Sequence, residues 1–209
     1  MKLQPAKFNA FLNNVAQQWL WRRAYACPCV SSNSGQPKPN CIHCMGNGRI
    51  WIEPVKGNAC VLGRDVVMKF GKFGLYHNED VFIEIPSDSP IYTMSTFDRL
   101  TSLNRTEPFT LNRVAGVNIP KTFNVVSLEK VFWFDSDNNE VVGTLPVIQA
   151  DGSLLWNGIV PPDGTTYSIT GRKNAEFYAF ESVPLDRSHF GGLDLPRRVV
   201  LRNFSQYEK

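Results

Sequence analysis

The sequence predicts a mainly β fold, an antiparallel β-sandwich or small barrel, with an N-terminal amphipathic helix and a cysteine-rich knuckle. Three observations predict it. Four of the five cysteines fall between residues 27 and 44. Only one segment, near the amino terminus, has convincing helical periodicity. The rest of the chain consists of short runs rich in β-branched and aromatic residues, which are separated by turn sequences and not by helices.

The helix is expected to begin after Pro5 and to end near Tyr25. Apolar residues recur there at steps of three and four, opposite a face of asparagines and glutamines: Phe8, Phe11, Leu12, Val15, Trp19 and Leu20. This pattern predicts an amphipathic helix of about four turns. Its aromatic stripe must pack on the rest of the domain or on a neighbouring subunit, and we favour the domain's own core.

The cysteines form two close pairs, Cys27-Pro28-Cys29 and Cys41-Ile42-His43-Cys44, and Gly46-Asn47-Gly48-Arg49 follows the second pair. Two pairs separated by a loop can bring four thiolates to the corners of a tetrahedron, which is the arrangement that Zn²⁺ prefers. The glycines let the chain curl tightly enough to point backbone N–H groups at the sulfurs. The sequence therefore predicts a zinc knuckle, in which one structural Zn²⁺ is held by Cys27, Cys29, Cys41 and Cys44.

The alternative is a pair of disulfides. Disulfide frameworks are usual in short secreted chains, but residues 1–12 lack the basic region and apolar core of a signal peptide. We therefore expect folding in a reducing cytoplasm and favour zinc. The first pair has the spacing CxC where zinc ribbons more often have CxxC, so the site is a variant. His43 is expected to face solvent, and Cys60, in an apolar context, to be a small buried thiol.

The segments expected to form strands are 49–52, 60–70, 80–85, 121–134, 141–149, 153–156, 165–170, 176–183 and 198–201. Turn sequences separate them, among them Asp137-Asn138-Asn139, Asp151-Gly152 and Asp163-Gly164. Residues 93–118 follow no clean period and are expected to form a long loop, or a pair of short strands, that projects from the barrel. The predicted domains are 1–58, the helix and zinc-knuckle region, and 59–209, the sandwich or barrel.

Composition argues against several classes of function. The 209 residues carry a formal net charge of +3, with no stripe of lysines or arginines that would indicate nucleic-acid binding. No apolar stretch approaches the roughly 20 residues needed to span a bilayer, so no membrane partner is expected. The hydrophobic content of 43% is that of an ordinary globular protein that can bury a core without help from a metal.

Catalytic motifs are missing from the sequence, so we expect no enzyme. The neighbours Asp186, Ser188 and His189 are an unconvincing triad, because triads assemble from distant parts of a chain. Asp135, Asp137 and Asn139 imitate a calcium loop, but Glu140 and Pro146 stand where a glycine and a glutamate are required, which favours a solvated hairpin tip. In a strand, Phe132 and Phe134 would face one way and Trp133 the other. We expect core on one side and an intersubunit contact on the other.

Several segments resemble neck proteins of tailed bacteriophages, the head-to-tail connector or head-closure group. A strand ending in tryptophan, a P-x-G-x-x-Y hairpin and an LPRRVVLR tail carry the likeness, with weaker similarity over residues 74–92 and at the cysteines. The residues concerned are Asp151–Trp156, Pro161–Ile169, Phe177–Phe180 and Leu195–Arg202. The chain departs from this pattern at Thr170-Gly171-Arg172-Lys173, where a more apolar strand end is expected.

This resemblance implies a structural virion protein, assembled in the host cytoplasm and located at the neck, which forms a homo-oligomeric, dodecameric ring. Its partners would be the portal protein, tail or adaptor proteins, and the genomic DNA that passes through the channel without sequence-specific binding. Identical subunits in a ring use heterologous contacts that close on themselves. The helix and residues 93–118 are candidate arms for such contacts. The tail Leu195–Arg202 could close the barrel edge, with its arginines reaching carboxylates on an adjacent ring.

Two other classes of function stay open. A zinc-dependent nucleic-acid-binding module is compatible with the cysteine pattern, although the small net charge and the missing basic stripe argue against it. A virion-associated enzyme such as a cell-wall hydrolase would need a carboxylate pair or an open metal site, for which the sequence offers no credible candidate. Salt-sensitive DNA binding would favour the first of these alternatives.

Overall fold

The computed structural model describes residues 4–63, 80–117, 124–149, 153–183 and 189–204. The mainly β fold is confirmed, because these ranges contain one short helix and otherwise strands and turns. The elements are α1 (Pro5–Val15), β1 (Gln17–Ala26), β2 (Arg49–Val61), β3 (Val81–Ile85), β4 (Arg99–Val114), β5 (Val125–Phe134), β6 (Glu140–Val142), β7 (Val147–Ile148), β8 (Leu154–Leu155), β9 (Thr166–Val183), β10 (His189–Phe190), β11 (Leu193–Asp194) and β12 (Arg197–Asn203).

The chain forms two compact units. The first comprises residues 1–104 and 176–209, and the second comprises residues 105–175. The long strands β4 and β9 each pass from one unit into the other along the chain. The domain boundary expected after residue 58 lies inside β2, which continues without interruption to Val61.

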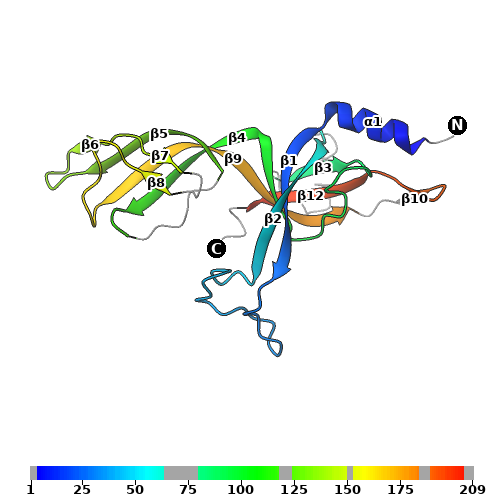
Figure 1. Cartoon of the computed structure of the whole chain (residues 1–209), viewed down its shortest axis with the longest axis horizontal. Coiled ribbons are helices and arrows are strands. Elements are labelled where there is room, and N and C mark those ends of the chain that lie inside the picture. Colours follow the sequence, from blue (N-terminus) through cyan, green and yellow to red (C-terminus); the bar gives the residue numbers. More distant parts are fainter. Residues whose placement is uncertain (1–3, 64–79, 118–123, 150–152, 184–188, 205–209) are drawn as a thin grey trace. The chain divides into compact units, whose positions relative to one another are not determined.

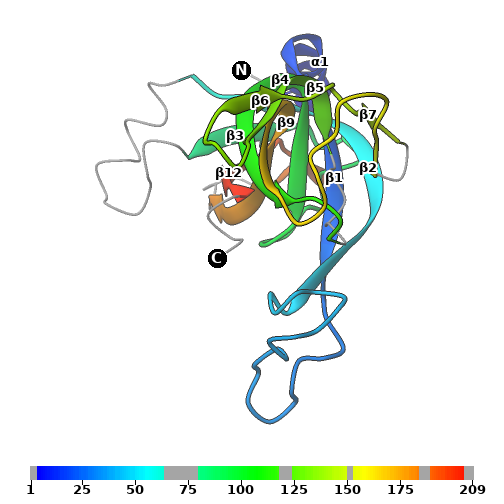
Figure 2. The same cartoon turned by 90° about the vertical axis from the view of Figure 1, so that its left-hand side faces the viewer.

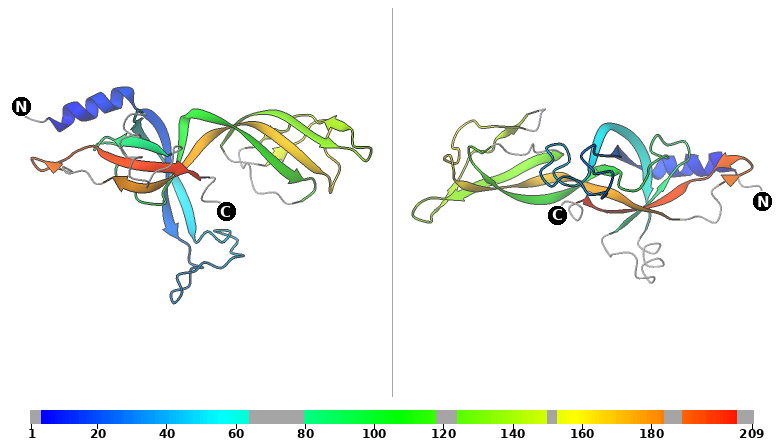
Figure 3. Two further views of the ribbon diagram at one scale, coloured as in Figure 1. Left: turned by 180° about the vertical axis from the view of Figure 1, so that it is seen from behind. Right: turned by 90° about the horizontal axis from the view of Figure 1, so that it is seen from below.

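The first unit contains a closed ring of six strands, which we call the barrel. Its order is β12-β3-β2-β1-β4-β9, and β12 pairs with β9 as well as with β3, so that each strand of the ring pairs with two neighbours. Figures 1 and 3 show β12 between these two neighbours. The expected small barrel with antiparallel pairing is therefore present, and the tail that carries Val199–Leu201 closes it.

Large side chains fill the barrel. Trp19 of β1 is almost completely buried, lies edge-on to Phe177 of β9 with ring centroids 6.0 Å apart, and donates its indole N–H to the carbonyl of Ala59. The other fully buried large side chains of the first unit are Phe82, Ile83, Ile85, Ile91, Met94, Leu100, Val199, Val200 and Leu201. Burial of this much apolar surface is the dominant favourable term in the folding of such a unit.

The helix is shorter than its periodicity predicts. It ends at Val15, and the chain continues in the extended strand β1, on which Trp19 and Trp21 are both buried. Two residues that lie two positions apart share one face of a strand, whereas on a helix they would diverge. The stripe is also not all core: Leu12 is buried, but Phe8 and Phe11 are exposed.

A buried carboxylate fixes an irregularity in β1. The pairing between β1 and β2 shifts register between Trp21 and Arg23. Asp98, which is 1% exposed, accepts hydrogen bonds from the backbone N–H of Ala24, the indole of Trp21 and the backbone N–H of Ser95, each at 2.8 Å. Because buried N–H groups need partners, Asp98 holds the bulge in place.

The arginines of β12 are engaged within the chain. Arg202 forms a bidentate pair with the buried carboxylate of Asp80, at 3.0 and 2.9 Å, and Arg198 lies 3.6 Å from Glu84. Both arginines thus have a carboxylate partner within their own chain, and the expected contact with an adjacent ring stays a prediction. The bidentate pair also accounts for the raised pKa of Arg202, because hydrogen bonding to Asp80 favours the charged guanidinium.

In the second unit the same eight-stranded sheet continues in the order β4-β9-β5-β6. The strands β7 and β8, which lie between β6 and β9 in the chain, form a separate two-stranded sheet. The core of the second unit contains Val131, Trp133, Tyr167 and Ile169, with Trp156 packed edge-on against Tyr167. Trp133 points into this core, whereas Phe134 faces outward and is 56% exposed. The predicted alternation along β5 is confirmed, and Asp135 caps the expected hairpin tip by accepting N–H groups of Asp137 and Asn139.

Two segments are more regular than expected. Residues 99–114 form the single strand β4 in place of a loop or two short strands, and β9 runs unbroken through Thr170–Lys173. Gly171 makes this continuity possible, because a Cβ at that position would lie 2.2 Å from the carbonyl oxygen of Ser127 on β5. The expected strand residues 64–70 and 121–123, the turn Asp151-Gly152, and Asp186 and Ser188 lie outside the described residues.

Candidate metal centre

The four clustered cysteines lie in the connection between β1 and β2. β1 ends at Ala26, which pairs with Arg49 at the start of β2, and the backbone N–H of Cys27 donates to the carbonyl of Gly48 at 2.8 Å. We call residues 27–48, which this hydrogen bond closes, the cysteine module. Figure 2 shows the two strands running together into the module.

Two tight turns present the sulfurs. The first follows Cys27, whose carbonyl accepts the N–H of Val30 at 3.0 Å. The second follows Cys41, whose carbonyl accepts the N–H of Met45 at 2.8 Å. Gly46 then adopts a φ of +86°, and a Cβ there would lie 3.0 Å from the carbonyl oxygen of Pro39. The predicted need for glycine after the second pair is confirmed at this position.

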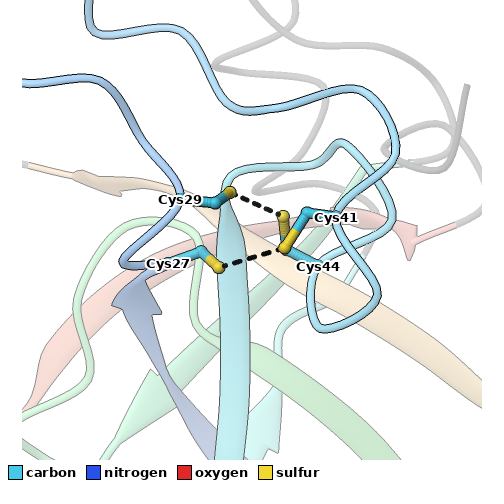
Figure 4. A group of neighbouring side chains, drawn as sticks. All are labelled: Cys27, Cys29, Cys41 and Cys44. Atoms are coloured by element: carbon cyan, nitrogen blue, oxygen red, sulfur yellow. Dashed lines mark hydrogen bonds between the residues drawn. The ribbon is translucent and has the colours of Figure 1, made fainter.

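The sulfur positions fit a tetrahedral metal site. All four Sγ atoms lie within 4.8 Å of one another, with Cys27 and Cys41 separated by 3.7 Å and Cys29 and Cys44 by 3.5 Å. Zn–S bonds of about 2.3 Å in a tetrahedron place sulfurs about 3.8 Å apart. A disulfide requires about 2.05 Å, and all four residues are free thiols here. Figure 4 shows the four side chains converging from the two turns.

The local hydrogen bonds make the thiols unequal. The backbone N–H groups of Cys44 and His43 lower the pKa of Cys41 to about 6, because they stabilise its thiolate. A backbone hydrogen bond from Lys38 also acts on Cys29, but burial and the neighbouring cysteines outweigh it and raise the pKa of Cys29 to about 12. A divalent cation would displace the remaining protons, so that metal affinity must fall with decreasing pH.

The module has almost no core of its own. Cys27, Cys44 and Gly48 are its buried residues, and Ile42 at the tip of the second turn is 85% exposed. Two prolines between the cysteine pairs pack against the glycines that follow the second pair: the ring of Pro37 lies against Gly48, and the backbone of Pro39 lies against Gly46. Sequence reasoning did not predict these contacts.

The remaining candidate ligands lie elsewhere. His43 is exposed, as expected, although it lies between two of the cysteines. Cys60 is buried, as expected, and donates its S–H to the carbonyl of Leu12 at the end of α1. His189 contacts Asp194 across the β10–β11 pair at 2.6 Å. Among the residues that the structure describes, the four cysteines form the single cluster of three or more potential metal ligands.

Within the described part of the chain, no helix combines the length and the apolar character that crossing a membrane requires. Comparison of the chain with known protein families finds no family model that matches, and comparison with curated proteins finds no similar sequence.

Proposed function

We propose that the cysteine module binds one structural Zn²⁺ through Cys27, Cys29, Cys41 and Cys44. The observation that carries this proposal is the convergence of four Sγ atoms within 4.8 Å in a segment with almost no apolar core. Four thiolates form a closed tetrahedral shell and leave no position for a reacting water, which is typical of structural sites. Metal binding would contribute folding free energy where too little core exists.

The zinc proposal is tested by metal analysis and native mass spectrometry of protein that was purified without chelator. We expect one zinc per chain, and Co²⁺ exchanged into the site should give the absorption bands of a tetrahedral thiolate complex. Less than half an equivalent of metal, or peptide mapping that finds two disulfides in freshly prepared lysate, would contradict the proposal.

We further propose that the chain is a structural virion protein of a tailed bacteriophage, in which a ring of identical subunits joins the portal to the tail and lines the DNA channel. The chain would act by assembly and would perform no catalysis. The resemblance of Asp151–Trp156, Pro161–Ile169 and Leu195–Arg202 to neck proteins supports this function. A fold with a closed barrel, a second β unit and an outward-facing helix offers extended surfaces for such contacts.

The structural observation that most favours assembly is the outward face of α1. Phe8, Phe11 and Val15 are 50%, 65% and 57% exposed, although the helix itself is fixed to the barrel through Leu12. Exposed apolar surface that is held on a well-anchored element marks contact sites for other chains.

Electron microscopy of particles of the phage that encodes the chain, labelled with Fab fragments raised against the purified protein, tests the location. We expect label at the head-tail junction; label elsewhere, or none, would overturn the proposed function. Deleting β12 is not a suitable test, because this strand closes the barrel and its loss would unfold the unit. Titration of duplex DNA at several salt concentrations tests the nucleic-acid alternative, which tight and salt-sensitive binding would favour.

A further inference from the structure

Basic residues are distributed unevenly along the chain. Residues 1–60 contain seven lysines and arginines and a single acidic residue, Glu53, whereas residues 61–209 contain 15 basic and 18 acidic residues. The net charge of +3 is therefore the sum of +6 in the first segment and −3 in the second. Asymmetry of this kind indicates a surface for a polyanionic partner.

The basic residues of the hairpin formed by β1, the cysteine module and β2 lack carboxylate partners. In the described part of the chain, ion pairs with carboxylates are formed by Arg99, Lys130, Lys173, Arg198 and Arg202, all outside residues 17–61. The hairpin carries five basic residues, and none of them forms an ion pair with a described residue: Arg22, Arg23, Lys38, Arg49 and Lys56.

Strand register places several cations on one face of the sheet. Arg22 lies directly opposite Arg99 of β4. Leu20, two positions before Arg22 on β1, lies opposite Lys56 of β2. Residues that lie opposite each other, or two positions apart on a strand, share a face. Arg22, Arg99 and Lys56 therefore project from the same side of the sheet.

Arg49 joins this face through two aromatic residues. The guanidinium carbon of Arg99 lies 5.8 Å from the ring centroid of Trp51, whose indole N–H donates to the carbonyl of Phe97 at 3.0 Å. Arg49, two positions before Trp51 on β2, covers the ring of Phe97 at 3.9 Å from its centroid. We call the four cations of this surface the basic face: Arg22, Arg49, Lys56 and Arg99.

Two arginines of the basic face share a single carboxylate. Glu176 of β9 accepts hydrogen bonds from Arg99 at 3.2 and 2.7 Å and from the Thr101 hydroxyl at 3.1 Å. Among the described residues, the guanidinium of Arg22 has one long hydrogen bond, 3.4 Å to the Thr101 hydroxyl. Burial and the positive charge of Arg99 lower the pKa of Arg22, against a weaker opposing effect of Glu176. Because a guanidinium stays charged, an anion would stabilise this partly buried cation.

The extent of the basic face selects a polymeric anion. Lys56 and Arg49 pair with Leu20 and Ala26, which lie six positions apart on β1, or roughly 20 Å at the rise of a strand. One small anion cannot bridge this distance. Duplex DNA carries one charge per about 1.7 Å of its axis, which is about twice the density that an extended acidic peptide offers at about 3.3 Å per residue. Arginine also matches the geometry of phosphate oxygens.

We propose that the basic face binds the phosphate backbone of duplex DNA without reading its sequence, which goes beyond the proposed function because that function assigns DNA no contact. Phosphate contacts fix position and carry no sequence information. Non-specific binding of this kind has a Kd of about 10⁻⁴–10⁻⁶ M at physiological salt, far weaker than a specific complex. The linear sequence shows no basic stripe, because strand pairing brings together cations that lie far apart along the chain.

The direct test is fluorescence anisotropy of a labelled duplex of about 12 base pairs, titrated with full-length, zinc-loaded protein at several salt concentrations. The logarithm of the binding constant should fall linearly with the logarithm of the salt concentration, with a slope of about −2.7 for three phosphate contacts. Each of the substitutions Arg22→Gln, Arg49→Gln and Lys56→Gln should reduce the slope by about 0.9 and weaken binding about tenfold at about 50 mM salt. Thermal melts check that each variant folds.

Arg23→Gln is the matched control, because it removes the same charge from the next position of β1. Consecutive residues of a strand point to opposite faces, and Arg23 lies over the ring of the buried Trp21, at 5.6 Å from its centroid. This variant should keep the wild-type slope and change the affinity less than about threefold. Equal losses in Arg22→Gln and Arg23→Gln would show that net charge alone governs binding, and would overturn the proposal.

Glu176→Gln tests the basic face in the opposite direction. The substitution removes the carboxylate that occupies Arg99, so that Arg99 becomes available to a fourth phosphate. The affinity should rise about threefold to tenfold, and the slope should become steeper by about 0.9. A gain of this kind cannot result from misfolding. Weaker binding by the folded variant would contradict the proposal.

Competitors identify the ligand. Unlabelled duplex of unrelated sequence should bind within about twofold of the labelled one, and single-stranded DNA should bind more weakly, with a slope of about −0.7 per contact. Inorganic phosphate, compared with chloride at equal ionic strength, should displace no duplex. A sequence preference, displacement by inorganic phosphate, or tighter binding of polyglutamate or of anionic phospholipid vesicles than of duplex DNA would overturn the proposal.

DNA binding and the location of the protein are tested separately. Wild-type protein that does not bind duplex DNA at about 50 mM salt, in particles that still carry label at the neck, would reject the basic face and leave the proposed function intact. Binding that is lost in the Arg22, Arg49 and Lys56 variants of a protein that is absent from the neck would support the basic face and reject the proposed function.

Discussion

The cysteine module and the barrel are connected by the same two strands, β1 and β2, but they are stabilised in different ways. In the barrel, side chains such as Trp19, Phe82 and Leu100 are almost completely removed from water. In the module, residues 31–36 are all exposed, and the inward-pointing groups are sulfurs. The difference teaches that strand pairing alone does not order a long connection. Apolar burial is sufficient in one region, and four converging thiols that can share a metal are needed in the other.

The largest expected effect comes from removing one ligand. Loss of a group that only hydrogen-bonds to a metal ligand typically changes metal affinity by about 10–100-fold, so Cys41→Ser, which removes a ligand itself, should weaken zinc binding by more than about 100-fold. Competition with a chromophoric chelator measures this affinity. Cys60→Ser is the matched control, because a serine hydroxyl can still donate to the Leu12 carbonyl and the residue lies outside the cluster. Equal loss of zinc in both variants would show that the module does not bind the metal by itself.

The next effect addresses the barrel alone. Trp19→Ala should destabilise the protein by about 3–5 kcal/mol, because it leaves a large cavity against Phe177 and removes the hydrogen bond to Ala59. Denaturant unfolding followed by circular dichroism measures the change. Tyr25→Ala, on the exposed part of the same strand, should change stability by less than about 0.5 kcal/mol. Zinc stoichiometry should stay at its wild-type value in both variants. A fall in zinc content with Trp19→Ala would contradict the view that the barrel and the cysteine module are stabilised independently.

A smaller loss of stability is expected when the bulge of β1 is disturbed. Asp98→Ala should cost about 1–3 kcal/mol, because it leaves buried N–H groups of Trp21, Ala24 and Ser95 without their acceptor. Chemical unfolding of the zinc-loaded protein provides the measurement. Asp88→Ala removes an exposed carboxylate from a neighbouring loop and should have little effect. If both substitutions were equally mild, Asp98 would not be the group that holds the bulge.

The smallest effect concerns proton uptake by the metal-free module. The pKa of Cys41 is lowered to about 6, below the unfolded thiol value of about 8.5, so its thiolate favours the folded turn above pH 8.5 and this contribution disappears as the pH falls through 6. At pH 7, iodoacetamide should therefore modify Cys41 before Cys29, whose pKa is raised to about 12. Peptide mass spectrometry follows the order of labelling. Faster labelling of Cys29 would contradict the hydrogen-bond pattern of the second turn.

How far the sequence predicts these regions depends on how local the determining interactions are. The cysteine cluster could be identified because ligand type, pair spacing and the following glycines all lie within residues 27–48. The end of α1 could not be predicted, because the apolar residues from Phe8 to Trp19 recur at helical spacing. Trp19 lies on a strand because its side chain packs in the core of the barrel, which is a contact that the local pattern does not contain. The strand β4 was not predicted for a similar reason. Thr101 and Ser102 are polar but are buried next to Leu100, so the alternation of polar and apolar residues does not indicate which positions of this strand are buried.

The pairing of β12 with both β3 and β9 was also beyond local patterns. Val199, Val200 and Leu201 indicated a strand. Its two partners both lie upstream: β3 is more than a hundred residues away, and the paired part of β9 is about twenty residues away. Such contacts are set by the closure of the whole ring. The same closure engages Arg202 with Asp80, a pair that the order of residues along the tail did not reveal.

Hydrogen-deuterium exchange of the full-length protein, with zinc and after chelation, tests the separation of the two regions most directly. We expect amide protection in residues 27–48 to be lost on chelation, while protection in β1, β3, β9 and β12 stays within about a factor of three, since local opening of one region need not lower the stability of the other. Cys41→Ser should show the chelated pattern without any chelator. Loss of protection throughout the barrel on removing zinc, or an unchanged module, would contradict the assignment of metal binding to the module and apolar burial to the barrel.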